Sequence, residues 1–97
     1  MTVLLVPEAQ QEFLDAVDYY AGAGASLARR FKEETTRCIN WIAVNHGHSR
    51  IRPGGYQRIN LKVFPFYLSF VVRGDVLWVL AVAHAARNPG YWIERRP

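Results

Sequence analysis

The sequence has little of what secreted, membrane and disulfide-bonded proteins need. Its one cysteine, Cys38, cannot form an internal disulfide bond, which fits a reducing cytosol. Its longest apolar run, Val76 to Ala83, is far shorter than the roughly 20 residues of a membrane-spanning helix. The N-terminus has no basic segment before a long apolar one, as a signal peptide would have. We therefore expect a cytoplasmic protein with no membrane partner.

The sequence is also poor in residues that bind metals or act as nucleophiles. The soft or borderline metal ligands are Cys38, His46, His48 and His84, and their spacing matches no zinc motif. No serine stands in a Gly-x-Ser-x-Gly context. The acidic side chains of the predicted helices are expected to face solvent and share no pocket: Glu8, Glu12, Asp15, Asp18, Glu33 and Glu34. We predict no metal site and no cofactor.

Basic residues are present in excess, and their distribution is uneven. Twelve Lys and Arg against eight Asp and Glu give a formal net charge of +4. The second half of the chain holds eight of these basic residues, opposed there only by Asp75 and Glu94. This asymmetry favours one face that meets an anionic surface, either nucleic acid or an acidic protein, although a solvated arginine-rich surface would look the same.

Hydrophobic periodicity predicts one α+β domain over residues 1–97. The segment "TVLLV" has the composition of a strand, and Pro7 then opens a helix. The residues "AGAG" end that helix, and a second apolar stripe runs from Leu27 to Ile42 at helical spacing. Three strands with short turns follow, at residues 56–64, 66–72 and 76–84. The predicted order is β-α-α-β-β-β, with an N-terminal helical hairpin packed on a small antiparallel sheet and the last strand central.

Basic and aromatic residues gather on the predicted sheet and the segment that follows it. Arg58 and Lys62 alternate along one strand, so their side chains should share a face. Arg73 closes the next strand, and His84 and Arg87 end the last. Together with a tyrosine, such residues could cleave RNA through its own 2′-hydroxyl without a metal. The alternative is that each is a solvated or structural residue.

Two segments resemble a known family. "AQQEFLDAVDYYA" resembles the first-helix pattern A-x-x-[DE]-[FL]-x-x-[AI]-x-x-[YW]-Y of the RelE/ParE superfamily, and "FPFYLSFVVRGDVLWVLAVAHAARNPGYW" resembles its last third. These proteins are bacterial toxins of type II toxin–antitoxin modules, also called plasmid stabilisation systems. The resemblance implies the same β-α-α-β-β-β fold. It also implies a cytoplasmic toxin that a cognate antitoxin holds inactive in a hetero-oligomer.

The resemblance leaves two activities open. RelE-like members are ribosome-dependent mRNA endonucleases, and here Arg58, Lys62, Arg87 and Tyr91 would be the catalytic residues. ParE-like members lack that full set and are associated with inhibition of DNA gyrase. Lys32 and Lys62 are the only lysines, and +4 is a mild charge for docking on ribosomal RNA. We therefore favour a ParE-like toxin that is not an enzyme. A member that only binds an antitoxin is a further alternative.

The C-terminal segment is predicted to be part of the binding surface. Pro89 should turn the chain back along the sheet, where Tyr91 and Trp92 anchor it by burial and hold Arg87 and Arg95 beside the basic face. Arg95 itself is expected to be exposed and to contribute little to stability. The predicted residues for binding the target or the antitoxin are Arg58, Lys62, Arg73, His84, Arg87, Tyr91, Trp92 and Arg95.

Overall fold

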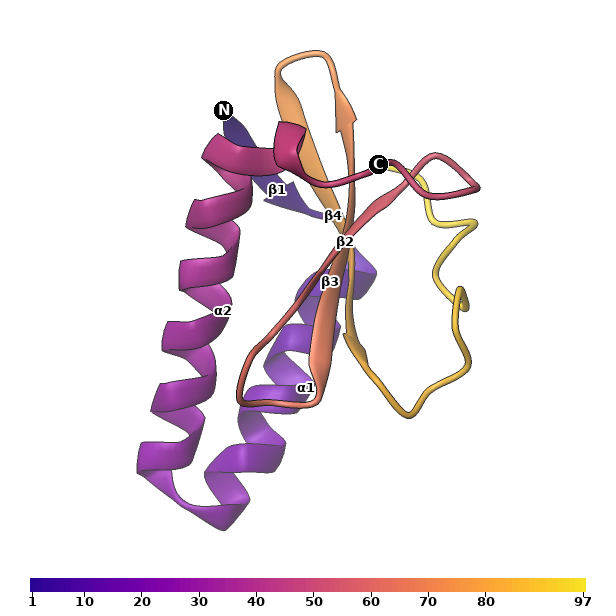
Figure 1. Ribbon diagram of the computed structural model, residues 1–97. Coiled ribbons are helices and arrows are strands. Elements are labelled where there is room, and N and C mark those ends of the chain that lie inside the picture. Colours follow the sequence, from indigo (N-terminus) through magenta and orange to yellow (C-terminus); the bar gives the residue numbers. More distant parts are fainter.

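Two helices cover one face of a four-stranded sheet, and the C-terminal tail lies on the opposite side (Figure 1). The computed structural model describes all residues from Met1 to Pro97. The elements in chain order are β1 (Thr2–Leu5), α1 (Pro7–Ala23), α2 (Ala25–Asn45), the short 3-10 helix η1 (His46–His48), β2 (Gln57–Asn60), β3 (Phe66–Arg73) and β4 (Val76–His84). The predicted α+β class and element order are confirmed. No helix combines the length and the apolar character that crossing a bilayer requires.

The sheet is mixed, with strand order β1-β4-β3-β2. The three later strands form the predicted antiparallel meander, and Gly74, at φ 63°, begins the two-residue turn between β3 and β4. The helical hairpin carries the chain from β1 to the far edge of the sheet, and the meander then brings β4 back beside β1. The two strands therefore run parallel, so the sheet is not antiparallel throughout as the sequence suggested.

Strand β4 is central, as predicted, and is apolar on both faces. Its regular pairing with β3 is interrupted by a bulge: Ser69 is opposite Ala81, but Phe70 is opposite Val79, so Leu80 has no partner on β3. Strand β1 pairs with β4 only as far as Val79. The second half of β4 therefore has a free edge on the side where β1 ends, and this edge faces α1.

The predicted helical stripes pack on the sheet. Phe31 of α2 is fully buried, with ring centroids 5.2 Å from Tyr20 of α1 and 5.1 Å from Phe66 of β3. The break between the helices is shorter than expected, because α1 continues to Ala23 and only Gly24 separates it from α2. Edge-to-face contacts of Tyr20 and Phe31 with Phe66 join both helices to the sheet.

Two predictions about polar residues are wrong. Glu12 and Glu34 do not face solvent: Glu34 is only 7% exposed and accepts two hydrogen bonds from the Val63 N–H, at 3.2 and 3.3 Å. Strand β2 ends at Asn60, so Lys62 lies in the following turn rather than on the strand with Arg58. The Leu61 N–H donates to the Phe66 carbonyl at 2.9 Å and so closes the turn between β2 and β3.

Candidate binding site at the C-terminal tail

The C-terminal tail, residues 85–97, runs back across the face of the sheet that the helices leave uncovered (Figure 1). Trp92 fixes it there. This side chain is buried, its indole Nε1–H donates to the Tyr67 hydroxyl at 3.0 Å, and its ring meets Tyr56 edge-on at 4.5 Å. The predicted anchoring of the tail by Trp92 is confirmed. Burial of a side chain of this size is among the largest single contributions available to a small domain.

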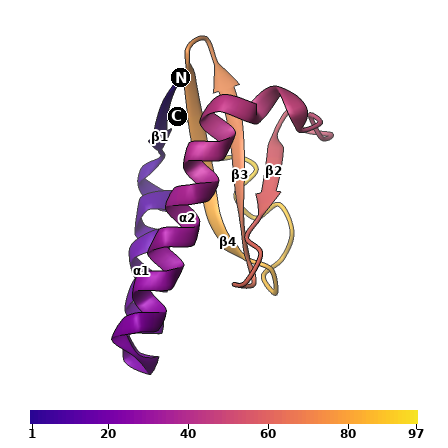
Figure 2. The same cartoon turned by 60° about the vertical axis from the view of Figure 1, so that its left-hand side comes forward.

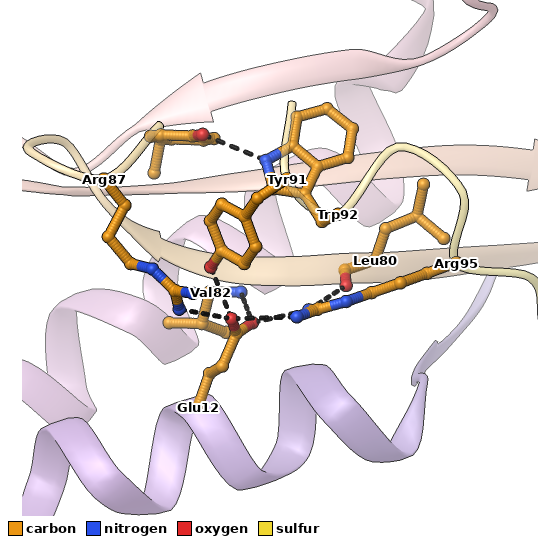
Figure 3. A network of polar contacts seen from close by, with 8 residues as sticks. Glu12, Leu80, Val82, Arg87, Tyr91, Trp92 and Arg95 are labelled. Atoms are coloured by element: carbon orange, nitrogen blue, oxygen red, sulfur yellow. Dashed lines mark hydrogen bonds and ion pairs between the residues drawn. The ribbon is translucent and has the colours of Figure 1, made fainter. Parts of the chain in front are cut away.

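A single carboxylate on α1 gathers the polar side chains of the tail. The Tyr91 hydroxyl donates to Glu12 Oε2. Arg95 binds the same carboxylate through both terminal nitrogens, at 2.8 Å to Oε1 and 3.2 Å to Oε2. Arg87 reaches Oε2 at 3.5 Å. Figure 3 shows Arg87, Tyr91 and Arg95 of the tail converging on Glu12 of α1.

The free edge of β4 explains why this carboxylate is needed. The Val82 N–H has no strand beside it, and it donates to Glu12 Oε1 at 3.1 Å. The Leu80 carbonyl accepts from Arg95 Nη1 at 3.0 Å (Figure 3). Glu12 and Arg95 thus replace a missing strand, because buried backbone groups without partners are costly. Their side chains are only 14% and 17% exposed, so the expectation that Arg95 is exposed is wrong.

The network keeps Tyr91 and Arg95 in fixed protonation states. Burial, together with the hydrogen bond to Glu12, raises the pKa of Tyr91 far above the usual value of a phenol. Burial alone would lower the pKa of the Arg95 guanidinium, but the hydrogen bond to Glu12 raises it above its ordinary value. Tyr91 therefore remains a neutral donor and Arg95 a cation at neutral pH. The Arg87 guanidinium stacks on the Tyr91 ring, 3.7 Å from its centroid.

The predicted site residues form separate groups rather than one site. Arg87, Tyr91, Trp92 and Arg95 come together in the tail. Arg58 stacks on the Tyr67 ring at 3.7 Å and bonds to Asn60. With Lys62 it borders a shallow depression of about 340 Å³ at the end of the sheet.

The other two predicted residues lie elsewhere. Arg73, at the β3–β4 turn, is exposed and bonds to the carbonyl of its own neighbour Val72 at 3.1 Å. With Arg95 it borders a pocket of about 100 Å³ under the end of the tail. His84 is opposite Phe66 in the sheet and therefore lies on the face that the helices cover. Its Nδ1 accepts from the Ala86 N–H at 3.0 Å, which is a structural role.

Glu12, which organises the tail, was missed by reasoning from residue types. At helical spacing it lies at the border of the apolar stripe of α1. At that border, periodicity does not show whether a polar side chain faces solvent or a polar partner inside the protein. One signal was present. Glu12 occupies the acidic position of the first-helix pattern A-x-x-[DE], three residues after Ala9.

The helical hairpin packed on a small sheet is the fold that the resemblance to the RelE/ParE superfamily implied. The chain belongs to the ParE toxin family, because the family model described as "ParE toxin of type II toxin-antitoxin system, parDE" matches residues 3–89. A chain of the solved chromosomal ParDE toxin–antitoxin system from P. aeruginosa has a similar fold, with a TM-score of 0.75 and 17% identity over 87% of this chain and 95% of that one. Curated protein sequences gave no significant match.

Proposed function

We propose that this protein acts as a toxin by binding DNA gyrase, and that a cognate antitoxin neutralises it in the cytoplasm. Membership of the ParE toxin family supports the toxin–antitoxin context. What we propose beyond family membership is the target, DNA gyrase, and neutralisation by a partner antitoxin. The alternatives, cleavage of mRNA on the ribosome and binding of an antitoxin without toxicity, predict different assay results.

The observation that favours binding over cleavage is the state of Tyr91. Cleavage of RNA through its 2′-hydroxyl needs groups that exchange protons with substrate and groups that contact the phosphate. The Tyr91 hydroxyl donates to Glu12 and its pKa is raised, so at neutral pH it forms almost no phenolate that could act as a base, and the hydroxyl is a weak acid. Two other members of the candidate catalytic set, Arg87 and Lys62, remain exposed.

The accessible cations support contact with an acidic surface. Arg87 is held flat on Tyr91, and Arg58 is held flat on Tyr67, so both present a guanidinium whose position is already restricted. A preorganised arginine loses less conformational entropy on binding than a free one. These two residues, with Arg73, are the candidate contacts for the target.

A supercoiling assay tests the proposal. Purified native protein is titrated into DNA gyrase with relaxed plasmid, and we expect inhibition of supercoiling. Arg87→Ala should inhibit about tenfold less well if Arg87 is a central contact, because such contacts contribute above 1 kcal/mol. Lys32→Ala, an exposed cation on α2, is the matched control and should inhibit like the native protein. Folded native protein that leaves supercoiling unchanged at saturating concentration would overturn the proposed target.

A further inference from the structure

A small pocket of about 100 Å³ lies between the end of the tail and the sheet. The tail leaves the sheet at the end of β4 and runs back toward the opposite end, where the β3–β4 turn lies (Figure 1, Figure 2). Side chains of the turn and of the tail therefore border the same pocket. Three of its lining residues are arginines, Arg73, Arg95 and Arg96, and none is acidic. We call it the arginine pocket.

The apolar walls of the arginine pocket are fixed by packing. Trp92 is buried, and its ring meets Tyr56 edge-on at 4.5 Å. The loop before β2 approaches the tail so closely that a Cβ atom on Gly54 would lie 3.0 Å from Ile93 Cδ1. The Arg52 N–H donates to the Tyr56 carbonyl at 2.7 Å and closes this loop. A ligand therefore enters a pocket that exists before it binds, which lowers the cost of binding.

Two of the three arginines have unused hydrogen-bond donors. Arg73 Nη1 donates to the Val72 carbonyl at 3.1 Å. Arg96 Nη1 donates to the carbonyls of Ile93 and Arg95, both at 3.0 Å. Neither guanidinium forms an ion pair with an acidic side chain, and their Nε and Nη2 groups have no hydrogen-bond partner. Each arginine is thus tethered to the backbone through one nitrogen and keeps two neighbouring donors for an oxyanion.

The charge and the size of the arginine pocket favour a phosphate group. Arg95 is neutralised by Glu12, at 2.8 Å, so Arg73 and Arg96 supply the uncompensated positive charge. A phosphate group carries about −1.5 to −2 charges at pH 7, whereas a carboxylate carries one and would leave one guanidinium unpaired. The volume is well below the roughly 300–1,000 Å³ of sites that enclose a drug-sized ligand. The phosphate group itself fits inside, and anything attached to it would lie outside.

We propose that the arginine pocket binds a phosphate group, either free or at the end of a nucleotide, and that Arg73 and Arg96 hold it. Because Arg73 belongs to the β3–β4 turn and Arg96 to the tail, the bound phosphate joins these two segments and stabilises the tail on the sheet. Binding requires neither gyrase nor an antitoxin. The inference is therefore independent of the proposed function.

Titration of inorganic phosphate into the isotope-labelled full chain tests this inference. The ionic strength is held constant with chloride, and amide and arginine side-chain chemical shifts are followed at neutral pH. We expect saturable shifts, largest at Arg73, Gly74 and Arg96, with a dissociation constant of about 1 mM or below. Acetate, which carries a single charge, should bind at least about tenfold more weakly.

A nucleoside monophosphate and the matching nucleoside distinguish the two sources of the phosphate group. Equal affinity for inorganic phosphate and for the monophosphate would assign the arginine pocket to the phosphate group alone. Binding of the monophosphate at least about tenfold more tightly would assign it to a nucleotide. The nucleoside should not shift the signals of Arg73 and Arg96, and a nucleoside that binds as tightly as the monophosphate would overturn the inference.

Matched variants separate the arginine pocket from general charge attraction. Arg73→Ala and Arg96→Ala should each weaken phosphate binding about tenfold, because each removes charge-assisted hydrogen bonds. Arg30→Ala removes the same charge from an exposed position on α2 and should bind phosphate like the native protein. Arg73→Lys keeps the charge but loses the planar fork, so its affinity should lie between those of Arg73→Ala and the native protein. Thermal melting of each variant checks that it is folded.

Three results would contradict the phosphate site: shifts that phosphate and acetate cause equally, shifts that do not saturate, and an affinity that Arg73→Ala and Arg96→Ala leave unchanged. Each would reduce the arginine pocket to nonspecific attraction of anions. Failure of the native protein to inhibit gyrase, with phosphate binding intact, would refute the proposed target but not this site.

Discussion

Replacement of Glu12 by alanine is expected to be the most destabilising single change outside the apolar core. The carboxylate is 14% exposed and accepts hydrogen bonds from Tyr91, Arg95 and the Val82 backbone N–H. Its removal leaves the Arg95 guanidinium, itself 17% exposed, without its ion-pair partner, and it leaves one edge N–H of β4 unsatisfied.

The size of the effect follows from the burial of the pair. Loss of one partner from a buried ion pair costs about 3–5 kcal/mol, and the residual exposure of this pair favours the lower end, about 3 kcal/mol. For a domain of about 100 residues, this lowers the thermal midpoint by about 12–24 °C. Asp18→Ala, an exposed carboxylate on the same helix, is the matched control and should stay within about 0.5 kcal/mol of the native protein.

A double-mutant cycle with Arg95→Ala isolates the pair. Because the double variant no longer contains an unpaired buried charge, it should be scarcely less stable than Glu12→Ala alone, so the two losses should not add. The free energies of unfolding are measured by urea denaturation, followed by circular dichroism. A Glu12→Ala variant that unfolds at the native urea concentration, or losses that add fully, would refute the view that this carboxylate holds the tail.

Three further outcomes are expected from the tail. Trp92→Ala should lower the free energy of unfolding by about 3–5 kcal/mol, measured in the same way, and a native-like value would mean that the indole does not fill the space under the tail. Arg87→Ala should change it by less than about 1 kcal/mol, because this exposed cation makes a long contact to Glu12 and a stacking contact with the Tyr91 ring, and exposed contacts of both kinds are weak. A larger loss would make Arg87 part of the scaffold. Tyr91 should resist ionisation in an alkaline absorbance titration. Since its pKa is raised in the folded protein, its contribution to stability is complete below the unfolded pKa near 10 and is lost as pH rises further. Tyr91→Phe should remove that part of the pH dependence of stability, and an unchanged alkaline profile would contradict the assignment.

The fold could be predicted because its signals are local. Apolar residues at helical spacing identified both helices, and the change to a period of two identified the three later strands. The pair Gly74–Asp75 indicated the turn between β3 and β4. The parallel pairing of β1 with β4 is not local, since it depends on where the meander returns the chain.

The site could be predicted only in part, for a related reason. Trp92 and Tyr91 were recognised as anchors because large aromatics in a short segment are rarely left exposed. Glu12 and Arg95 are 83 residues apart, and their pairing depends on the bulge at Leu80 and on the end of β1, which together leave an edge to be satisfied. The first-helix pattern marks position 12 as acidic, but no pattern of residues near Glu12 or near Arg95 shows that these two side chains pair. For the same reason, Arg95 looked like an ordinary surface arginine.

Whether this protein binds a target or cleaves RNA is tested most directly by primer extension on an mRNA undergoing translation in a reconstituted system, with and without the purified native chain. Since the Tyr91 hydroxyl is held by Glu12, we expect identical extension products in both reactions, at protein concentrations that inhibit gyrase supercoiling. New cleavage products that appear with the native chain and disappear with folded Tyr91→Phe would contradict this, and would make Tyr91 a catalytic residue.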